Sequence, residues 1–193
     1  IRSAMGRDVA LSASAPIVWG LDVARFGGDN SALCVRQGNT VLDIVTFPSM
    51  DLMQLCGAVK NKFDDSTAIE QPSEILVDVI GLGSGVVDRL AEQGLPVRGV
   101  NVAEAPATKK NYLNLRAELW FAVKDWLAQR NCRLPENDEL ASELAAPLYK
   151  YTSSGKIKIE SKDEMRKRGI KSPDKADALA LTMASSAASF GGS

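Results

Sequence analysis

The chain has 193 residues, of which 45% are hydrophobic and 24% charged, which is enough for one globular domain and too little for two ordinary ones. Lys and Arg number 23 against 24 Asp and Glu, so the net charge is −1 and binding to a polyanion would require a local basic patch. There is no histidine, which excludes Ser-His-Asp triads, Cys-His pairs and zinc sites of the HExxH type. Any catalysis would therefore depend on carboxylates, lysines or bound metal ions.

The three cysteines, Cys34, Cys56 and Cys132, are odd in number and widely spaced, so neither a zinc ribbon nor a disulfide framework is expected. No apolar run reaches the roughly 18 residues that cross a bilayer. We therefore expect a reducing, cytoplasmic environment. Because the chain does not begin with Met, we expect a fragment of a longer protein, with a linker or lead-in over residues 1–15 and one domain over residues 16–190.

Three strands are predicted at the start of this domain. Residues 17–24 form an apolar run that is typical of a buried strand. Residues 31–36 and 40–47 are strand-like and are separated by the sequence QGN (residues 37–39), which is a hairpin signal. Because short connections join the three strands, we expect them to be antiparallel neighbours.

Helices and strands alternate in the next part of the chain. Leu52, Leu55 and Val59 recur at spacings of three and four, which predicts an amphipathic helix over residues 50–63. The elements predicted after it are a strand (74–80), a glycine-rich turn (81–85), a helix (86–93), a strand (96–102), a long helix (112–130) and a shorter helix (139–146). A strand, a helix and a strand in this order indicate parallel pairing through a crossover.

The last part of the chain predicts a second hairpin and a closing helix. Strand-like residues 148–152 and 156–159 flank a Ser-Ser-Gly turn. Ser172 is the expected N-cap and Pro173 the first residue of a helix that runs through residue 188. The order of elements predicts an RNase H-like α/β fold of the integrase/resolvase type: a mixed sheet of three antiparallel strands and then parallel strands, flanked by helices, with an extra hairpin.

Three aspartates lie among apolar neighbours. Asp22 interrupts the first strand, Asp78 interrupts the fourth, and Asp177 lies about one turn into the closing helix. A carboxylate in apolar surroundings is costly unless a partner or a cation compensates its charge. If the first and fourth strands are neighbours, the three side chains share one cleft. Carboxylates without histidine suit Mg²⁺ or Mn²⁺, so we predict a metal site at Asp22, Asp78 and Asp177.

Each of these aspartates also has a structural explanation when it is taken alone. A strand aspartate can lie at the strand end and cap a turn. Asp177 can be a first-turn carboxylate that the helix dipole favours. Asp29 and Asp174 are weaker candidates for the metal site, and Asp174 lies three residues before Asp177, on a similar face of the helix.

Four segments carry a resemblance to a known family. They are GLDVA (residues 20–24) with GDNSA (28–32), VD (77–78) with GLGSGVVD (81–88), NLRAELW (114–120) and KSPDKADALA (171–180). In this order they resemble the motifs of the nuclease domain of large terminase subunits from tailed double-stranded DNA bacteriophages. The resemblance spans residues 17–186.

The resemblance implies an RNase H-like, metal-dependent endonuclease that cuts concatemeric viral DNA during genome packaging in the cytoplasm of the infected bacterial host. It also implies two divalent cations, Mg²⁺ or Mn²⁺, with Asp22 bridging both and Asp78 and Asp177 each holding one. The implied partners are double-stranded DNA, an N-terminal ATPase motor domain of the same polypeptide, the small terminase subunit and the portal protein, and no membrane. The chain contains no GxxxxGK[ST] phosphate loop, so we expect the nuclease without the motor.

Basic residues near the predicted cleft are candidates for DNA contact. Residues 162–175 hold six basic and three acidic side chains and follow the predicted hairpin, so they could lie across a phosphate backbone. The predicted contacts are Lys162, Arg166 and Lys171, with Lys109, Lys110 and Arg116 as a second group. The alternative is a solvated surface loop. Trp19, Trp120 and Trp126 are assigned to the core and not to base stacking.

Two alternative function classes share the predicted fold. Actin-like ATPases and sugar kinases also end the first strand in an aspartate, but they usually place Gly two residues later, where this chain has Ala24. They also need a second lobe. A non-catalytic DNA-docking module is the other alternative, and the presence of all three aspartates argues against it.

Two further motif matches are weak. The sequence GLGSG (residues 81–85) has GxGxG spacing, whereas a dinucleotide-binding turn has GxGxxG. A PD…(D/E)xK nuclease is suggested by Pro173-Asp174 and by ESK (residues 160–162), but the two parts occur in the reverse order.

Overall fold

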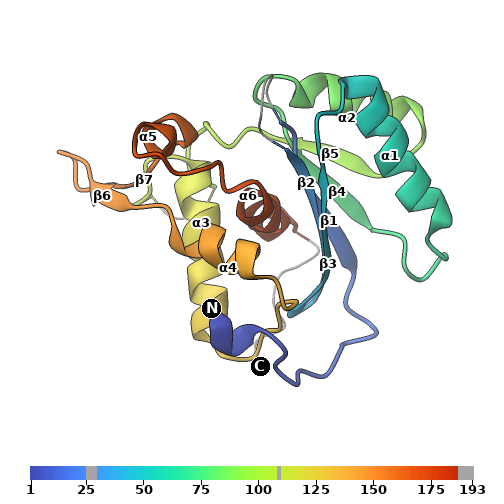
Figure 1. The fold of residues 1–193 in the computed structure, drawn as a ribbon, viewed down its shortest axis with the longest axis horizontal. Helices are drawn as coiled ribbons and strands as arrows, with labels where there is room; N and C mark the ends of the chain where they lie inside the picture. Colours follow the sequence, from blue (N-terminus) through green and yellow to red (C-terminus); the bar gives the residue numbers. More distant parts are fainter. Residues whose placement is uncertain (25–29, 108–109, 187–193) are drawn as a thin grey trace.

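The computed structural model describes residues 1–24, 30–107 and 110–186. Its centre is a five-stranded sheet with helices on both faces (Figure 1). The strands lie in the order β3 (Thr40–Phe47), β2 (Ser31–Gln37), β1 (Ile17–Asp22), β4 (Glu74–Asp78) and β5 (Val97–Val100). The pairs β1–β2 and β2–β3 are antiparallel, whereas β4 is parallel to β1 and to β5. The mixed sheet predicted from the sequence is confirmed.

Each face of the sheet is covered by its own group of helices (Figure 1). One face carries α1 (Leu52–Asp65) and α2 (Gly83–Glu92), and the other carries α3 (Leu115–Ala128), α4 (Asp138–Ala145) and α6 (Asp174–Leu181). Alternation along β1 separates the two cores, because Trp19 and Leu21 pack toward α1 and α2, whereas Val18 packs toward α3 and α6. Even-numbered residues of β1 and β4 therefore face α6.

Helix α6 packs so closely on β1 that the two backbones are in direct contact at Gly20. A Cβ atom at Gly20 would stand 2.1 Å from the carbonyl oxygen of Ala178, so only glycine permits this approach. The far end of the helix is fixed by Arg36 on β2, whose Nε donates to the Thr182 hydroxyl and whose Nη2 donates to the Thr182 carbonyl, both at 2.8 Å. These contacts hold α6 over the middle of the sheet.

A two-stranded hairpin lies apart from the main sheet, beyond α3 (Figure 1). It consists of β6 (Tyr149–Tyr151) and β7 (Ile157–Ile159), which confirms the second predicted hairpin. The basic segment after it is not a loop throughout, because α5 (Lys162–Lys167) forms there. Ser161 and Glu164 make a capping box at its start: each side chain accepts a hydrogen bond from the other residue's backbone N–H, at 3.1 and 2.8 Å.

The closing helix differs from the prediction at both ends. Ser172 is not the N-cap: α6 begins at Asp174 after Pro173, and the Ser172 hydroxyl is buried without a hydrogen-bond partner among the described residues. Glu143 of α4 takes the capping role, because its carboxylate accepts from the Ala176 N–H at 3.0 Å. The α-helix ends at Leu181 and is followed by a 3-10 turn (Thr182–Ala184), so it does not continue to residue 188 as one α-helix.

Other element boundaries also differ from the prediction. The strand predicted over residues 74–80 ends at Asp78, and α2 begins inside the predicted turn, at Gly83. Helix α3 begins at Leu115 and not at residue 112, because the Asn114 side chain caps it by accepting from the Ala117 N–H at 3.0 Å.

The first residues of the chain contact the domain at a few positions. The Ala4 carbonyl accepts from the Leu134 N–H at 2.8 Å, and Arg7 donates to the Cys132 carbonyl at 3.2 Å. Ala4 itself is buried. The domain boundary at residue 16 stays a prediction. Among the described residues, no helix is long and apolar enough to cross a membrane.

The approach of α6 to β1 can be tested with Gly20→Ala. We expect a loss of about 1–3 kcal/mol in the free energy of unfolding, since the added methyl group meets a backbone oxygen that cannot rotate away. Gly57→Ala on α1 is the matched control: its Cβ would meet nothing within 4 Å, and alanine is favoured in a helix interior by about 0.5–1 kcal/mol. Urea unfolding of both variants checks the prediction, and equal midpoints would contradict it.

Candidate metal centre

Asp22 and Asp78 are the last residues of β1 and β4. The sequence pattern predicts them inside the two strands, but the structure places them at the strand ends, where the chain leaves the sheet. Leu21 pairs with Val77 in the parallel register, so the two aspartates that follow lie side by side. Both side chains are on the α6 face because they are even-numbered residues of the alternating pattern.

A sharp turn after β4 allows this arrangement. A Cβ atom at Gly83 would stand 1.7 Å from the Asp78 carbonyl oxygen, so the start of α2 passes at backbone distance from the strand end. The Asp78 carboxylate accepts a hydrogen bond from the Ile80 N–H at 3.1 Å. The predicted glycine-rich segment therefore serves the turn next to the carboxylates.

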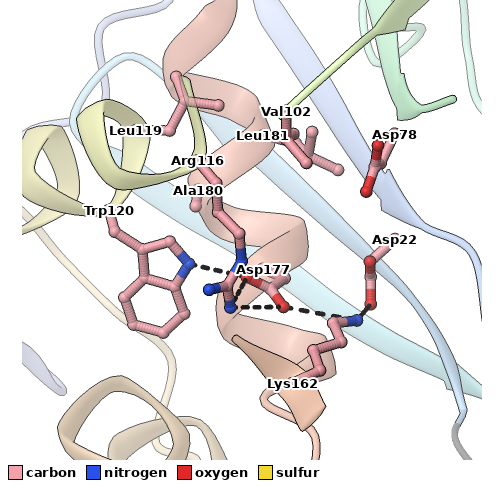
Figure 2. A pocket seen from close by; sticks show the side chains of 10 residues that line it. All are labelled: Asp22, Asp78, Val102, Arg116, Leu119, Trp120, Lys162, Asp177, Ala180 and Leu181. Atoms are coloured by element: carbon pink, nitrogen blue, oxygen red, sulfur yellow. Dashed lines mark hydrogen bonds and ion pairs between the residues drawn. The ribbon is translucent and has the colours of Figure 1, made fainter. Parts of the chain in front are cut away.

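Asp177 reaches the same place from α6. A cavity of about 30 Å³ is lined by Asp22, Asp78 and Asp177, together with Arg116 and Lys162 (Figure 2). Most of these side chains also line a broader cleft of about 270 Å³ that continues along β7 and α5. The structure thus brings the three predicted carboxylates together, although their catalytic roles stay predictions.

Lys162 lies between the carboxylates and not at the surface (Figure 2). Its Nζ is 2.8 Å from Asp22 Oδ2 and 3.4 Å from Asp177 Oδ2. Asp174, a weaker candidate in the sequence, also contacts Lys162 Nζ at 3.4 Å and accepts from the Asn30 N–H at 3.2 Å. The Lys162 ammonium group is engaged with buried carboxylates, and its predicted phosphate contact stays a prediction.

Two residues of α3 hold Asp177. The Trp120 indole N–H donates to Asp177 Oδ1 at 2.7 Å, and Arg116 Nη2 lies 3.1 Å from the same oxygen (Figure 2). The sequence predicts a DNA contact for Arg116, but its guanidinium group is engaged with this carboxylate. The core assignment of Trp120 is correct in that the residue is buried, yet its polar atom faces the centre.

The pKa values of the two buried aspartates Asp22 and Asp177 are shifted in opposite directions. Burial raises the pKa of Asp22 to about 7, and the neighbouring charge of Asp177 adds to this, against the lowering by Lys162. Burial would also raise the pKa of Asp177, but Arg116, Lys162 and the Trp120 N–H outweigh it, so that pKa is lowered. Burial alone would lower the pKa of Lys162, and the surrounding carboxylates reverse the direction.

The donor set fits a hard divalent cation. The three carboxylates supply oxygen ligands only, and the Lys162 ammonium group already occupies a position that stabilises positive charge. Among the described residues, no three Asp, Glu, Cys or His side chains are arranged to hold a metal ion. The metal site at Asp22, Asp78 and Asp177 stays a prediction, and the Lys162 ammonium group contacts two of these three carboxylates.

The other predicted DNA contacts are scattered. Arg166 binds Asp163 at 2.7 Å and lines the broader cleft, together with Lys158, a basic residue that the sequence pattern does not mark. Lys171 is exposed and lines a separate hollow beside α4, and Lys110 is exposed. Lys109 and the weaker carboxylate candidate Asp29 lie outside the described residues.

No protein-family model and no curated protein sequence matches the chain. Solved structures do match. The nuclease domain of the large terminase subunit gp2 of bacterial virus Sf6, in a mutant form with manganese and beta-thujaplicinol, is 23% identical, with a TM-score of 0.76 and 90% of each chain covered. A mutant form of this subunit with calcium is 21% identical, with a TM-score of 0.75 and coverage of 95% of this chain and 96% of that chain.

The large terminase nuclease from thermophilic phage G20c with bound magnesium is similar over 90% of this chain and 83% of that chain, at 15% identity and a TM-score of 0.67. At these identities the matches show the fold, which is the RNase H-like mixed sheet flanked by helices. The resemblance predicted from the motifs is confirmed at the level of the fold.

Lys162→Met tests the competition between the ammonium group and a cation. In EDTA we expect a loss of stability of about 3–5 kcal/mol, because the buried carboxylates lose their counter-charge. Added Mn²⁺ should raise the unfolding midpoint of the variant more than that of the wild-type chain.

Lys158→Met is the matched control for Lys162→Met. Lys158 lines the same cleft, but its ammonium group pairs with Glu164 at 2.9 Å and not with the aspartates of the centre. Thermal unfolding with EDTA or Mn²⁺ checks all three proteins. An equal effect of Mn²⁺ on Lys162→Met and on the wild-type chain would show that the ammonium group does not compete.

Proposed function

We propose that this chain is a metal-dependent endonuclease that cuts double-stranded DNA by hydrolysis of a phosphodiester bond. The observation that carries the proposal is the convergence of three carboxylates, from β1, β4 and α6, in one cavity at the C-terminal ends of two inner strands of an RNase H-like sheet. The fold alone does not define an activity, so the proposal rests on this cluster. The solved nuclease domains with manganese, calcium or magnesium add support by similarity.

Asp22 is the best candidate to contact two cations. It lies beside Asp78 through the β1–β4 register, and it shares Lys162 with Asp177. Asp78 and Asp177 would then each hold one cation from opposite sides. Bound divalent cations would supply the charge that activates a water molecule and stabilises the departing 3′ oxygen. The products would carry 5′-phosphate and 3′-hydroxyl ends.

The chain itself provides the approach for the phosphodiester. The cleft of about 270 Å³ opens beside the cavity and is lined by Lys158 and Arg166, whose positive charges suit a phosphate backbone. Arg116 and Trp120 fix Asp177 on the opposite side. Contacts of this kind recognise the backbone and not the base sequence, which suits an enzyme that cuts many sequences.

The biological setting follows from the motif resemblance together with the solved terminase nucleases. We propose that the substrate is concatemeric viral DNA and that cutting accompanies genome packaging. The expected partners are an N-terminal ATPase motor domain of the same polypeptide, a small terminase subunit and a portal protein, in the cytoplasm of an infected bacterium.

The activity is tested by plasmid cleavage with Mg²⁺, Mn²⁺ or EDTA. We expect cutting with either cation and none with EDTA. Asp78→Asn should lower the rate by more than about 100-fold, since even residues that only orient a metal ligand contribute about 10–100-fold. Gel assays of supercoiled, nicked and linear DNA measure the rate.

Asp88→Asn is the matched control for Asp78→Asn. Asp88 is an exposed aspartate of α2, outside the cavity, and its substitution should leave the rate unchanged. Full activity of Asp78→Asn would disprove its role as a ligand. Cutting that persists in EDTA would disprove the metal-dependent mechanism.

DNA contacts are tested through the salt dependence of binding. Lys110→Gln, Arg166→Gln and Lys171→Gln are each made in the Asp78→Asn protein, so that DNA is bound but not cut. Each substitution that removes one phosphate contact should lower the magnitude of the slope of log affinity against log salt by about 0.9.

Lys60→Gln is the control for the DNA-binding variants, because Lys60 lies on α1, across the sheet from the centre, where it pairs with Asp64. Fluorescence anisotropy over a range of NaCl concentrations measures the slopes. An unchanged slope for Arg166→Gln would remove that residue from the DNA-binding surface.

A further inference from the structure

The two oxygens of the Asp177 carboxylate have different surroundings. Oδ1 accepts from the Trp120 indole N–H at 2.7 Å and from Arg116 Nη2 at 3.1 Å. Oδ2 lies 3.4 Å from Lys162 Nζ, on the side of the other carboxylates, and also 3.4 Å from Arg116 Nη2, which is a longer contact than the one at Oδ1. Oδ1 is therefore the oxygen that α3 holds more closely, and Oδ2 is the oxygen that also faces Lys162 (Figure 2).

The anchoring group is itself held. Arg116 Nη1 donates to the Glu160 carbonyl at 2.6 Å, and its guanidinium carbon lies 5.7 Å from the centre of the Trp120 ring. The Arg116 side chain is only 15% exposed. It thus links α3, the Asp177 carboxylate and the junction between β7 and α5, immediately before Lys162. A guanidinium fork fixed at both branches leaves the carboxylate little freedom to rotate.

We infer that Trp120 and Arg116 are positioning residues, which orient Asp177 so that Oδ2 is presented to a divalent cation. The inference rests on the proposed function and assigns a role to two residues outside the carboxylate set. A buried indole N–H requires an acceptor, and here the acceptor is a candidate metal ligand. Partners that orient a metal ligand typically contribute about 10–100-fold to metal affinity or activity.

Trp120→Phe is the decisive variant, because it keeps an aromatic ring in the core and removes the N–H donor. Trp126→Phe is its matched control. Trp126 lies on the same helix and is 1% exposed, and its indole N–H donates at 3.1 Å to Asn39, which does not line the cavity. Both variants lose one indole hydrogen bond, buried at Trp120 and part-buried at Trp126, so a general effect on folding would appear in both.

Mn²⁺ binding measured by titration calorimetry, without DNA, is the readout. We expect Trp120→Phe to weaken Mn²⁺ binding by about 10-fold or more, and Trp126→Phe to leave it unchanged. Arg116→Lys should also weaken binding, because lysine lacks the planar fork whose separate branches reach Asp177 and the Glu160 carbonyl. In the Asp177→Asn background, Trp120→Phe should have no further effect, since the group it orients is gone.

Each outcome decides the question. Equal Mn²⁺ affinity of Trp120→Phe and wild type would overturn the inference and leave the proposed function standing. Equal weakening by Trp120→Phe and Trp126→Phe would also overturn it, because the effect would then be one of folding. A wild-type chain that binds no Mn²⁺ would overturn the proposed function and this inference with it. If Trp120→Phe does not fold, Arg116→Lys with the Asp177→Asn background provides the same comparison.

Discussion

The burial of negative charge at the end of β1 and on the first turn of α6 is the condition to which the rest of the centre responds. Asp22, Asp174 and Asp177 are each less than a tenth exposed, and carboxylates removed from water are costly unless their charge is compensated. Compensation comes from separate parts of the chain, with Lys162 supplied by α5 and Arg116 by α3. Both compensating groups therefore come from helices outside the sheet, and the packing of these helices places positive charge beside the buried carboxylates.

The sheet defines where the carboxylates come together. Alternation along β1 and β4 directs the terminal aspartates toward α6, and the parallel register makes them neighbours. Helix α6 adds the third carboxylate. Its distance from the sheet is fixed, since its backbone contacts Gly20 and its end is bound by Arg36. The sheet and α6, two rigid parts of the fold, thus supply the three carboxylates. The compensating lysine lies on a helix of six residues next to a small hairpin, so the cation-like group is on the less extensively packed part of the molecule.

Much of this could be predicted from the sequence, for identifiable reasons. The strands and helices have clear hydrophobic periods, and Asp22 and Asp78 are conspicuous because they interrupt apolar runs. The role of Lys162 could not be predicted, because its contact with Asp22 joins residues 140 positions apart and depends on the path of α5. The contact of Trp120 with Asp177 could not be predicted for another reason. A buried aromatic residue fits the pattern of a core helix, and that pattern does not indicate where the indole N–H points. The Ser161–Glu164 capping box is a visible local signal for α5, although the density of charge in this segment favours a loop.

The contact between Gly20 and α6 has a consequence for how the domain can vary. A side chain at position 20 would meet the carbonyl oxygen of Ala178, which every residue carries, so no replacement at position 178 can make room for it. A smaller residue at Thr182 would relieve only the secondary contact, which a Cβ at position 20 would make at 3.0 Å. Second-site suppressors of a change at position 20 would therefore have to shift the whole helix, and that shift would carry Asp177 away from Asp22. The packing of α6 on β1 and the placement of Asp177 beside Asp22 therefore depend on the same glycine, so a change at position 20 affects both.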